Sequence, residues 1–259
     1  MEWVLGCGQN NFGTGFIVLF IKIAILELWV LLGFIAQSYA FDLVTTNLPN
    51  HGWYIDIGGR WNDYNLSELN GYLKYYQNPK FNNGGSYKLD LWYFYSSRLS
   101  CSAGMEYIDN TRKGISSYRP PYPPGQTLDY TFRLKAYIPN FELRYFFSLP
   151  HVDYYVSLGQ MFCVAKFRKR LADQSLVGQS YYLQNREFPG YGIGFSVASG
   201  MLKEISSNIK INIQAGYRYL KSGDLEYDKG VPLDYYRKNI AVDFSGAFCE
   251  FTVLYRIAK

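Results

Sequence analysis

From residue 52 to the end, the chain alternates apolar and polar residues in segments separated by turns. In residues 209–219 the odd positions are apolar or aromatic and most even positions are polar, which is the period of a two-faced strand. The same period occurs in residues 53–61, 87–95, 132–138 and 141–147. One face of these strands is therefore expected to contact a different environment from the other.

The turns between the segments alternate between short and long. Short breaks occur at residues 97–100, 149–152 and 206–208, and long polar stretches occupy residues 62–85, 113–128, 168–189 and 222–237. Four long loops and three short turns predict an all-β protein, an eight-stranded antiparallel up-and-down transmembrane β-barrel. In such barrels the short turns are periplasmic and the long loops extracellular, so both termini are expected in the periplasm.

The alternation changes phase at two places. The first is around Pro139, where one long strand with a β-bulge explains both the slip and the missing backbone donor. A hairpin at Pro139 is the alternative and would add a ninth strand. The second is near Cys249, where we also predict a bulge.

A soluble β-sandwich or a lipocalin-like barrel would also show strands of period two. Three features favour the membrane. The chain has 26 Tyr and 18 Phe, which cluster near strand ends as in a membrane girdle. The segments are longer than ordinary soluble strands. Most polar faces carry full charges, which a soluble core could not bury so often without partners.

The N-terminus indicates export. Lys22 precedes an apolar run, and small residues at Ser38 and Ala40 fit a signal-peptidase site, so residues 1–40 are predicted to be a signal peptide with an over-extended start. Residues 41–259 would form the outer-membrane barrel domain. The alternative, an uncleaved helix over residues 16–36, would place Lys22 and Glu27 inside the bilayer.

The net charge is +5 for the whole chain, and the cations are spread along the barrel segments. Nucleic acid is therefore not an expected partner. Attraction to outer-membrane lipids, and to anionic lipopolysaccharide in particular, accounts better for the excess of Lys and Arg.

Candidate catalytic chemistry is sparse. The only histidines are His51 and His151, both expected at the periplasmic end, whereas barrels that hydrolyse or acylate lipids use a histidine near the outer leaflet. Neither a metal-ligand spacing nor a phosphate loop occurs. We therefore expect no enzyme activity, no catalytic residue, no metal and no cofactor. A lipid-modifying enzyme remains the less favoured alternative.

Charged residues on the predicted inner faces have both signs. An eight-stranded barrel is only just wide enough to be filled by side chains, so these charges are expected to pair across the lumen and close it. They are Asp56, Arg60, Lys88, Asp90, Glu106, Arg133, Lys135, Glu142, Arg144, Lys210, Arg218, Asp243 and Glu250. A narrow pore for transport is the alternative.

The long loops are rich in tyrosine, a composition that favours ligand binding. The predicted binding residues are Tyr118, Arg119, Tyr122, Tyr181, Tyr182, Tyr235 and Tyr236, with Tyr64 and Tyr72 also expected on the outer surface. Residues 118–125 are proline-rich and should form a stiff tip. The alternative is that these rings only extend the upper membrane girdle.

The loop rhythm, the alternation and the closing strand resemble the small eight-stranded outer-membrane barrels typified by the OmpA membrane domain and the OmpX/Ail group. The resemblance covers residues 52–259, and residues 251–257 look like the signal read by the barrel-assembly machinery, although the chain ends without an aromatic residue. It implies the bacterial outer membrane as location. Members of that group act as adhesins, serum-resistance factors, anchors or narrow pores, so we expect a surface-binding or adhesion protein with a possible host or surface ligand.

Overall fold

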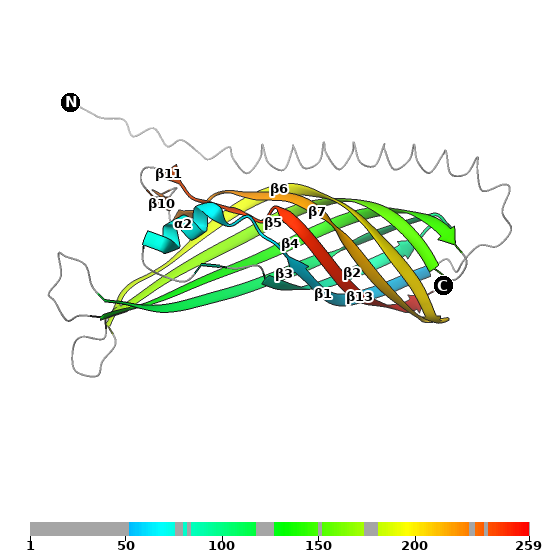
Figure 1. The fold of residues 1–259 in the computed structure, drawn as a ribbon, viewed down its shortest axis with the longest axis horizontal. Coiled ribbons are helices and arrows are strands. Elements are labelled where there is room, and N and C mark those ends of the chain that lie inside the picture. Colours follow the sequence, from blue (N-terminus) through cyan, green and yellow to red (C-terminus); the bar gives the residue numbers. More distant parts are fainter. Residues whose placement is uncertain are drawn as a thin grey trace, which may run out of the picture. The chain divides into compact units, whose positions relative to one another are not determined.

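The computed structural model describes residues 52–75, 80–81, 84–117, 127–149, 152–173, 181–227, 231–235 and 238–258 (Figure 1). The predicted eight-stranded antiparallel barrel is confirmed. Its strands are β1 Gly52–Asn62, β2 Gly84–Phe94, β3 Leu99–Ser117, β4 Thr127–Leu149, β5 Val152–Asp173, β6 Tyr181–Ser206, β7 Ile209–Asp224 and β13 Gly246–Ala258. Each pairs with the next, and β13 pairs with β1 to close the sheet. The predicted signal peptide, residues 1–40, lies outside the described residues.

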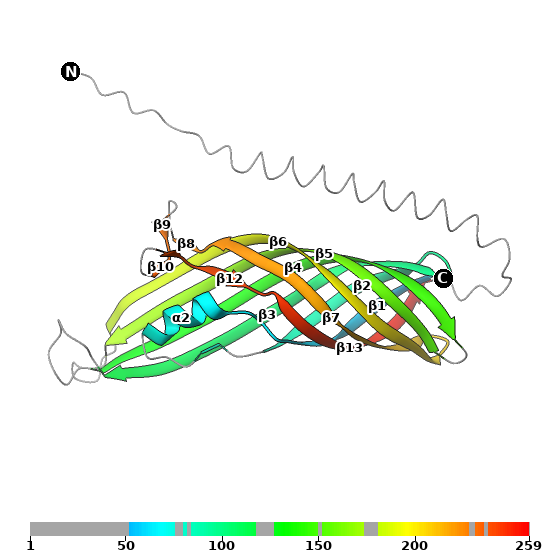
Figure 2. The ribbon, with the colours of Figure 1, turned by 45° about the horizontal axis from the view of Figure 1, so that its top comes forward.

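The two ends of the barrel differ in their connections. The end with the tight connections at residues 95–98 and 207–208 is called the turn end here, and the opposite end is called the loop end. At the loop end lie the helix α2 (Ser67–Tyr75) and the short strands β8 (Glu226–Tyr227), β9 (Val231–Pro232), β10 (Asp234–Tyr235), β11 (Lys238–Asn239) and β12 (Ala241–Asp243) (Figure 2). Among the described residues, no helix has the length and apolar character needed to cross a bilayer.

Apolar side chains cover the outside of the barrel toward the turn end. Ile57, Leu158 and Tyr87 are 60%, 63% and 76% exposed, and they belong to a continuous outward row of such residues on every barrel strand. Aromatic rings stand at both margins of this band. Trp53, Tyr93, Tyr145 and Tyr255 lie toward the turn end, and Trp61, Tyr87, Tyr137 and Tyr191 lie toward the loop end. A band of this kind bounded by two rings of aromatic residues is the outer surface of a membrane barrel.

The predicted bulge at Pro139 is wrong. Met105 pairs with Pro139, and the register between β3 and β4 is unbroken from Leu99 to Ser117. All even residues of β4 from Tyr130 to Phe146 are buried on the inside, so the strand never changes face. What changes is the environment. After Pro139 the inward residues Asn140, Glu142 and Arg144 are polar and the outward residues apolar, whereas before it, toward the loop end, the inside is apolar and the outside charged.

The same explanation applies near Cys249, where the predicted second bulge is also wrong. The β13 register with β7 is continuous from Gly246 to Tyr255, and Phe248 and Leu254 both point inward. Val242 and Phe244, on the preceding segment, are also buried. The aromatic residues before Cys249 fill the barrel at the loop end, and those after it face outward.

The inside of the barrel is filled in three layers. A layer of aromatic and aliphatic residues closes the turn end: Tyr54, Trp92, Phe94, Phe146, Tyr155, Leu202 and Leu254. A layer of charged residues lies in the middle. A larger apolar cluster fills the loop end and includes Ile108, Phe132, Leu134, Phe167, Leu220 and Phe244.

Helix α2 completes the apolar layer at the loop end. Leu69 and Leu73, four residues apart on one helix face, are fully buried in this cluster with Leu66 and Tyr72. Asn70 holds the following segment, because its side chain accepts from the Phe81 N–H at 2.8 Å and donates to the Phe81 carbonyl at 3.0 Å. From the sequence pattern, only a polar loop was predicted at residues 62–85.

Two other predicted loops are partly strand. β3 and β4 include residues 113–117 and 127–128, and β5 and β6 include residues 168–173 and 181–189. These four strands are longer than β1, β2, β7 and β13, and they extend further at the loop end (Figure 1). Their outer faces carry polar and charged residues at the loop end, so the sequence pattern there resembles a loop.

Candidate functional site

The middle layer of the barrel is a network of buried ion pairs. Arg60 Nε lies 2.8 Å from Glu250 Oε2, and Arg60 Nη1 lies 3.0 Å from Glu106 Oε2. Glu106 also receives Arg218 Nη1 at 2.8 Å. All four side chains are almost fully buried. Their charges are therefore neutralised by one another and not by water.

Lys88 is the second centre of this network. Its Nζ lies 2.9 Å from Asp90 Oδ2, 3.2 Å from Glu142 Oε1 and 3.1 Å from Glu250 Oε1. Glu142 also pairs with Arg144, whose guanidinium stacks on the Trp92 ring with its Cζ 3.6 Å from the centroid. The charged layer is thus joined directly to the aromatic layer at the turn end.

Asp56 is the exception within this layer. Its carboxylate is buried, and neither oxygen has a hydrogen-bond partner among the described residues. It is the direct cross-strand neighbour of Asp90, which is engaged by Lys88.

The structure brings most of the predicted interior charges together. Asp56, Arg60, Lys88, Asp90, Glu106, Glu142, Arg144, Arg218 and Glu250 are buried inside the barrel. Lys210 also points inward but lies nearer the turn end, 3.7 Å from Glu204. Which residues pair across the lumen depends on the tilt and register of distant strands, so the sequence pattern alone could not give the partners.

The prediction that Arg133, Lys135 and Asp243 point into the lumen is wrong. Arg133 is half-exposed on the outside of β4 and forms an ion pair with Asp109 on β3. Lys135 lies on the same outer face. Asp243 lies in β12 at the loop end, where it accepts from Asn65 Nδ2 at 3.2 Å and from the Ser245 N–H at 2.9 Å. The errors for Arg133 and Lys135 follow from the predicted bulge at Pro139. Because β4 has no bulge there, its odd residues all face outward.

The predicted tyrosine-rich surface is only partly described. Tyr118, Arg119, Tyr122 and Tyr236 lie outside the described residues. Tyr181, Tyr182 and Tyr235 lie in β6 and β10, and only the backbone of these three residues is described. Tyr64 and Tyr72 were expected on the outer surface and are instead buried in the apolar layer. Tyr72 packs edge-on against Phe132 and Phe167.

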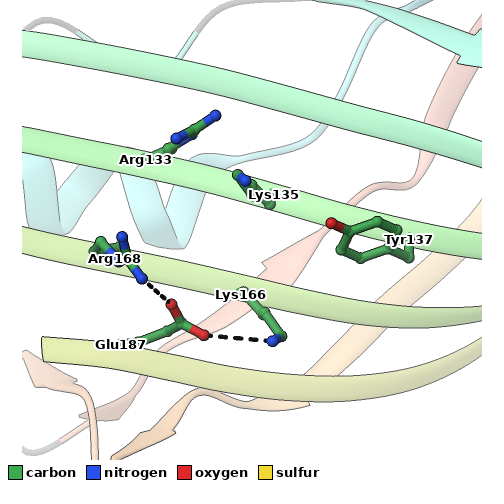
Figure 3. Close-up of a pocket in the computed structure, with 6 residues that line it drawn as sticks. All are labelled: Arg133, Lys135, Tyr137, Lys166, Arg168 and Glu187. Atoms are coloured by element: carbon green, nitrogen blue, oxygen red, sulfur yellow. Dashed lines mark hydrogen bonds and ion pairs between the residues drawn. The ribbon is translucent and has the colours of Figure 1, made fainter.

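A group of cations on the outer wall was not predicted as a site. Arg133, Lys135 and Tyr137 of β4, Lys166 and Arg168 of β5, and Glu187 of β6 line a shallow hollow of about 260 Å³, called the basic hollow here (Figure 3). Arg168 donates to Glu187 Oε2 at 2.9 Å, and Lys166 Nζ lies 3.5 Å from Glu187 Oε1. Four cations thus face one carboxylate in the lining.

The cations of the basic hollow stand opposite each other. Across β4 and β5, Arg133 is the direct partner of Arg168, and Lys135 is the direct partner of Lys166. The next outward residue of β4 is Tyr137, the aromatic residue at the margin of the apolar band. The hollow therefore begins where the apolar band ends. A signal for it was present in the sequence, as charged residues recur at every second position in both strands.

Two carboxylates beside these cations are held ionised. The hydrogen bond from Arg133 lowers the pKa of Asp109. Partial desolvation raises the pKa of Glu187, but the hydrogen bond from Arg168 and the charge of Lys166 outweigh it, so this pKa is also below its ordinary value. Within the described residues, no group of three or more His, Cys, Asp or Glu side chains is arranged to hold a metal ion.

Comparisons with solved structures found several similar proteins. The chain itself forms a closed eight-stranded antiparallel barrel. It is similar to the crystal structure of Neisserial surface protein A, at 15% identity and a TM-score of 0.37, over 82% of this chain and 100% of that one. It is also similar to Ail, the attachment invasion locus protein of Yersinia pestis, at 17% identity and a TM-score of 0.35, over 80% of this chain and 100% of that one.

A third similar structure is the outer membrane protease OmpT from Escherichia coli, at 11% identity and a TM-score of 0.41, over 83% of this chain and 99% of that one. No protein-family model and no curated protein sequence matches this barrel protein. These likenesses concern the fold alone.

Proposed function

We propose that this protein is located in the bacterial outer membrane, that its lumen is plugged, and that it acts as a surface-binding or adhesion protein without catalysis. The apolar band supports the location, since Ile57, Tyr87 and Leu158 would be costly to expose to water over a whole barrel circumference. The long loops would then face the outside of the cell and the turn end the periplasm.

One observation carries the plugged lumen. The guanidinium of Arg60 on β1 contacts carboxylates from three other strands, Glu106 on β3, Glu142 on β4 and Glu250 on β13. A single side chain thus links walls that surround the lumen, and apolar layers lie on both sides of it. Such layers would interrupt a continuous polar path through the lumen, and function would then depend on the outer surface and the loops.

Planar-bilayer recording tests this part of the proposal. The purified barrel should give no conductance or only a very small one. Large, stable openings comparable to those of a general porin would favour the narrow-pore alternative. That alternative has one observation in its favour, the carboxylate of Asp56, which has no hydrogen-bond partner among the described residues.

Expression in a heterologous outer membrane tests the binding role. The protein should raise adherence to host cells, serum components or anionic polysaccharide. Replacing residues 118–125 and the pair Tyr181 and Tyr182 by Gly and Ser should abolish the gain, whereas Gly at Ser207 and Asn208, in the opposite turn, should not. Lipopolysaccharide and phospholipid masses should stay unchanged, because a lipid hydrolase or acyltransferase would alter them. Unchanged adherence in a folded loop variant would argue against binding by these tyrosines.

A further inference from the structure

The outer wall of the barrel changes character abruptly along three neighbouring strands. On β4 the outward residue Tyr137 is followed by Lys135 and Arg133, and on β5 Val164 is followed by Lys166 and Arg168. On β3 the same switch occurs between Tyr107 and Asp109. Tyrosine rings at such a margin lie at the headgroup level of a bilayer. The basic hollow is therefore at headgroup level, on the lipid-facing wall and outside the lumen.

The arrangement of charge in the hollow favours an anion. Like charges directly opposite each other on neighbouring strands destabilise a sheet. Here Arg133 faces Arg168 and Lys135 faces Lys166, so two such pairs are adjacent. Two carboxylates flank these cations. Glu187 on β6 accepts from Arg168, and Asp109 on β3 accepts from Arg133. Among the described residues, Lys135 has no carboxylate within ion-pair distance.

We propose that the basic hollow binds a phosphate group of an anionic glycolipid in the outer leaflet of the membrane. Arginine and lysine bind phosphate oxygens through charge-assisted hydrogen bonds, and a phosphate between β4 and β5 would relieve the repulsion of both cation pairs. The hollow, at about 260 Å³, is below the range of about 300–1,000 Å³ that encloses a whole drug-sized ligand. It therefore takes one headgroup phosphate, while the acyl chains lie along the apolar band beside Tyr137.

The position of the hollow selects a lipid over a soluble anion. A lipid packed against the apolar band presents its phosphate at the height of Lys135 and Lys166 without losing the full translational freedom of a soluble ligand. This inference rests on the proposed outer-membrane location, and it does not depend on what the loops bind.

Native mass spectrometry of the purified barrel in detergent tests the proposal, with diphosphorylated lipid A as the probe. The double variant Lys135→Gln and Lys166→Gln should bind about thirtyfold more weakly, because each cation near a lipid headgroup contributes roughly a factor of five. Dephosphorylated lipid A should bind the native protein as weakly as the phosphorylated form binds the variant. The matched control is Arg98→Gln with Lys203→Gln, which removes the same charge from the turn end and should leave the dissociation constant within about twofold.

Three outcomes would overturn the proposal: equal lipid A binding by the variant and the native protein, equal binding of phosphorylated and dephosphorylated lipid A, or a variant that loses a soluble heparin oligosaccharide but keeps lipid A. The last would assign the hollow to a soluble polyanion. Heat-modifiable migration of each variant establishes that it is folded. Protease accessibility on intact cells tests the location separately, so failure of the location and failure of the lipid site are distinguishable.

Discussion

Arg60 and Glu250 join the first strand of the barrel to the last. They are direct cross-strand partners in β1 and β13, and both Nε and Nη2 of Arg60 donate to Glu250 Oε2, the first at 2.8 Å. Both side chains are buried at the seam where the sheet closes. Lys88 on β2 also reaches Glu250, at 3.1 Å, so the seam is held from both sides of β1.

Removing the carboxylate at this seam should destabilise the barrel strongly. Glu250→Gln removes a carboxylate that two buried cations, Arg60 and Lys88, share, and breaking a buried ion pair from one side costs about 3–5 kcal/mol. We expect a loss of this size in the free energy of unfolding, measured by urea titration of the protein in detergent with migration on unheated gels as the readout.

Asp109→Asn is the control for that measurement. It breaks the pair with Arg133, which is half-exposed on the outer wall, and exposed pairs contribute about 0–1 kcal/mol. A similar loss in both variants would mean that the interior network is hydrated and that the lumen is open to water.

Helix α2 should act as a separable plug of the loop end. Leu69→Ala removes a fully buried side chain from the apolar layer and should cost about 2–5 kcal/mol locally. Trypsin cleavage after Lys74 or Lys80 should then become faster, while the strands toward the turn end stay folded. Gly71→Ala is the matched control, because a Cβ there meets no atom within 4 Å and should leave cleavage unchanged or slower. Equal cleavage of L69A and the native protein would contradict this role for the helix.

Turn spacing and period two were enough to predict the number and order of the barrel strands, because both depend on local sequence. They were not enough to assign faces in β4. The alternation of residues in β4 indicates only which face of the strand is apolar. That face is on the outside of the barrel around Phe141 and on the inside around Phe132. Without knowing where lipid ends, Arg133 and Lys135 look like lumen residues. The change of phase at Pro139 marks the place where the outer face of β4 changes from charged to apolar.

Other features needed information that a linear pattern lacks. Helix α2 has only two buried leucines at helical spacing, Leu69 and Leu73, within a polar stretch. Arg60 and Glu106 are 46 positions apart, and their contact depends on the register of three strands. The candidate lipid site was visible as alternating cations, but its cross-strand pairing required the structure.

Gly104 makes room for the charged layer. It lies directly opposite Asp90 across β2 and β3, and a Cβ at this position would collide with the Asp90 carboxylate and the Leu89 carbonyl. Gly104→Ala should therefore push Asp90 away from Lys88 and cost about 1–3 kcal/mol in the free energy of unfolding. Gly85→Ala is the matched control on β2, since its Cβ would have only the Arg60 carbonyl nearby, at 4.0 Å. If both variants unfold at the same urea concentration, the layer is looser than described.

Glu187 should limit anion binding in the basic hollow. It engages Arg168 at 2.9 Å and Lys166 at 3.5 Å, so Glu187→Gln would free both cations and is expected to tighten lipid A binding. Because its pKa is lowered in the folded protein, its contribution to stability is present above the ordinary carboxyl pKa of about 4 and is lost as the pH falls through the lowered value.

Acidification should therefore imitate the Glu187→Gln substitution. Lipid A affinity of the native protein should rise as the pH falls through the lowered pKa of Glu187, since a phosphate monoester keeps one negative charge there, whereas E187Q should show only the smaller rise that comes from protonation of Asp109 beside Arg133. Glu204→Gln, an exposed carboxylate toward the turn end, serves as the control and should follow the native curve. Weaker lipid binding by E187Q at neutral pH would mean that the carboxylate orients Arg168 and Lys166 toward the phosphate, and that its charge does not compete with the ligand.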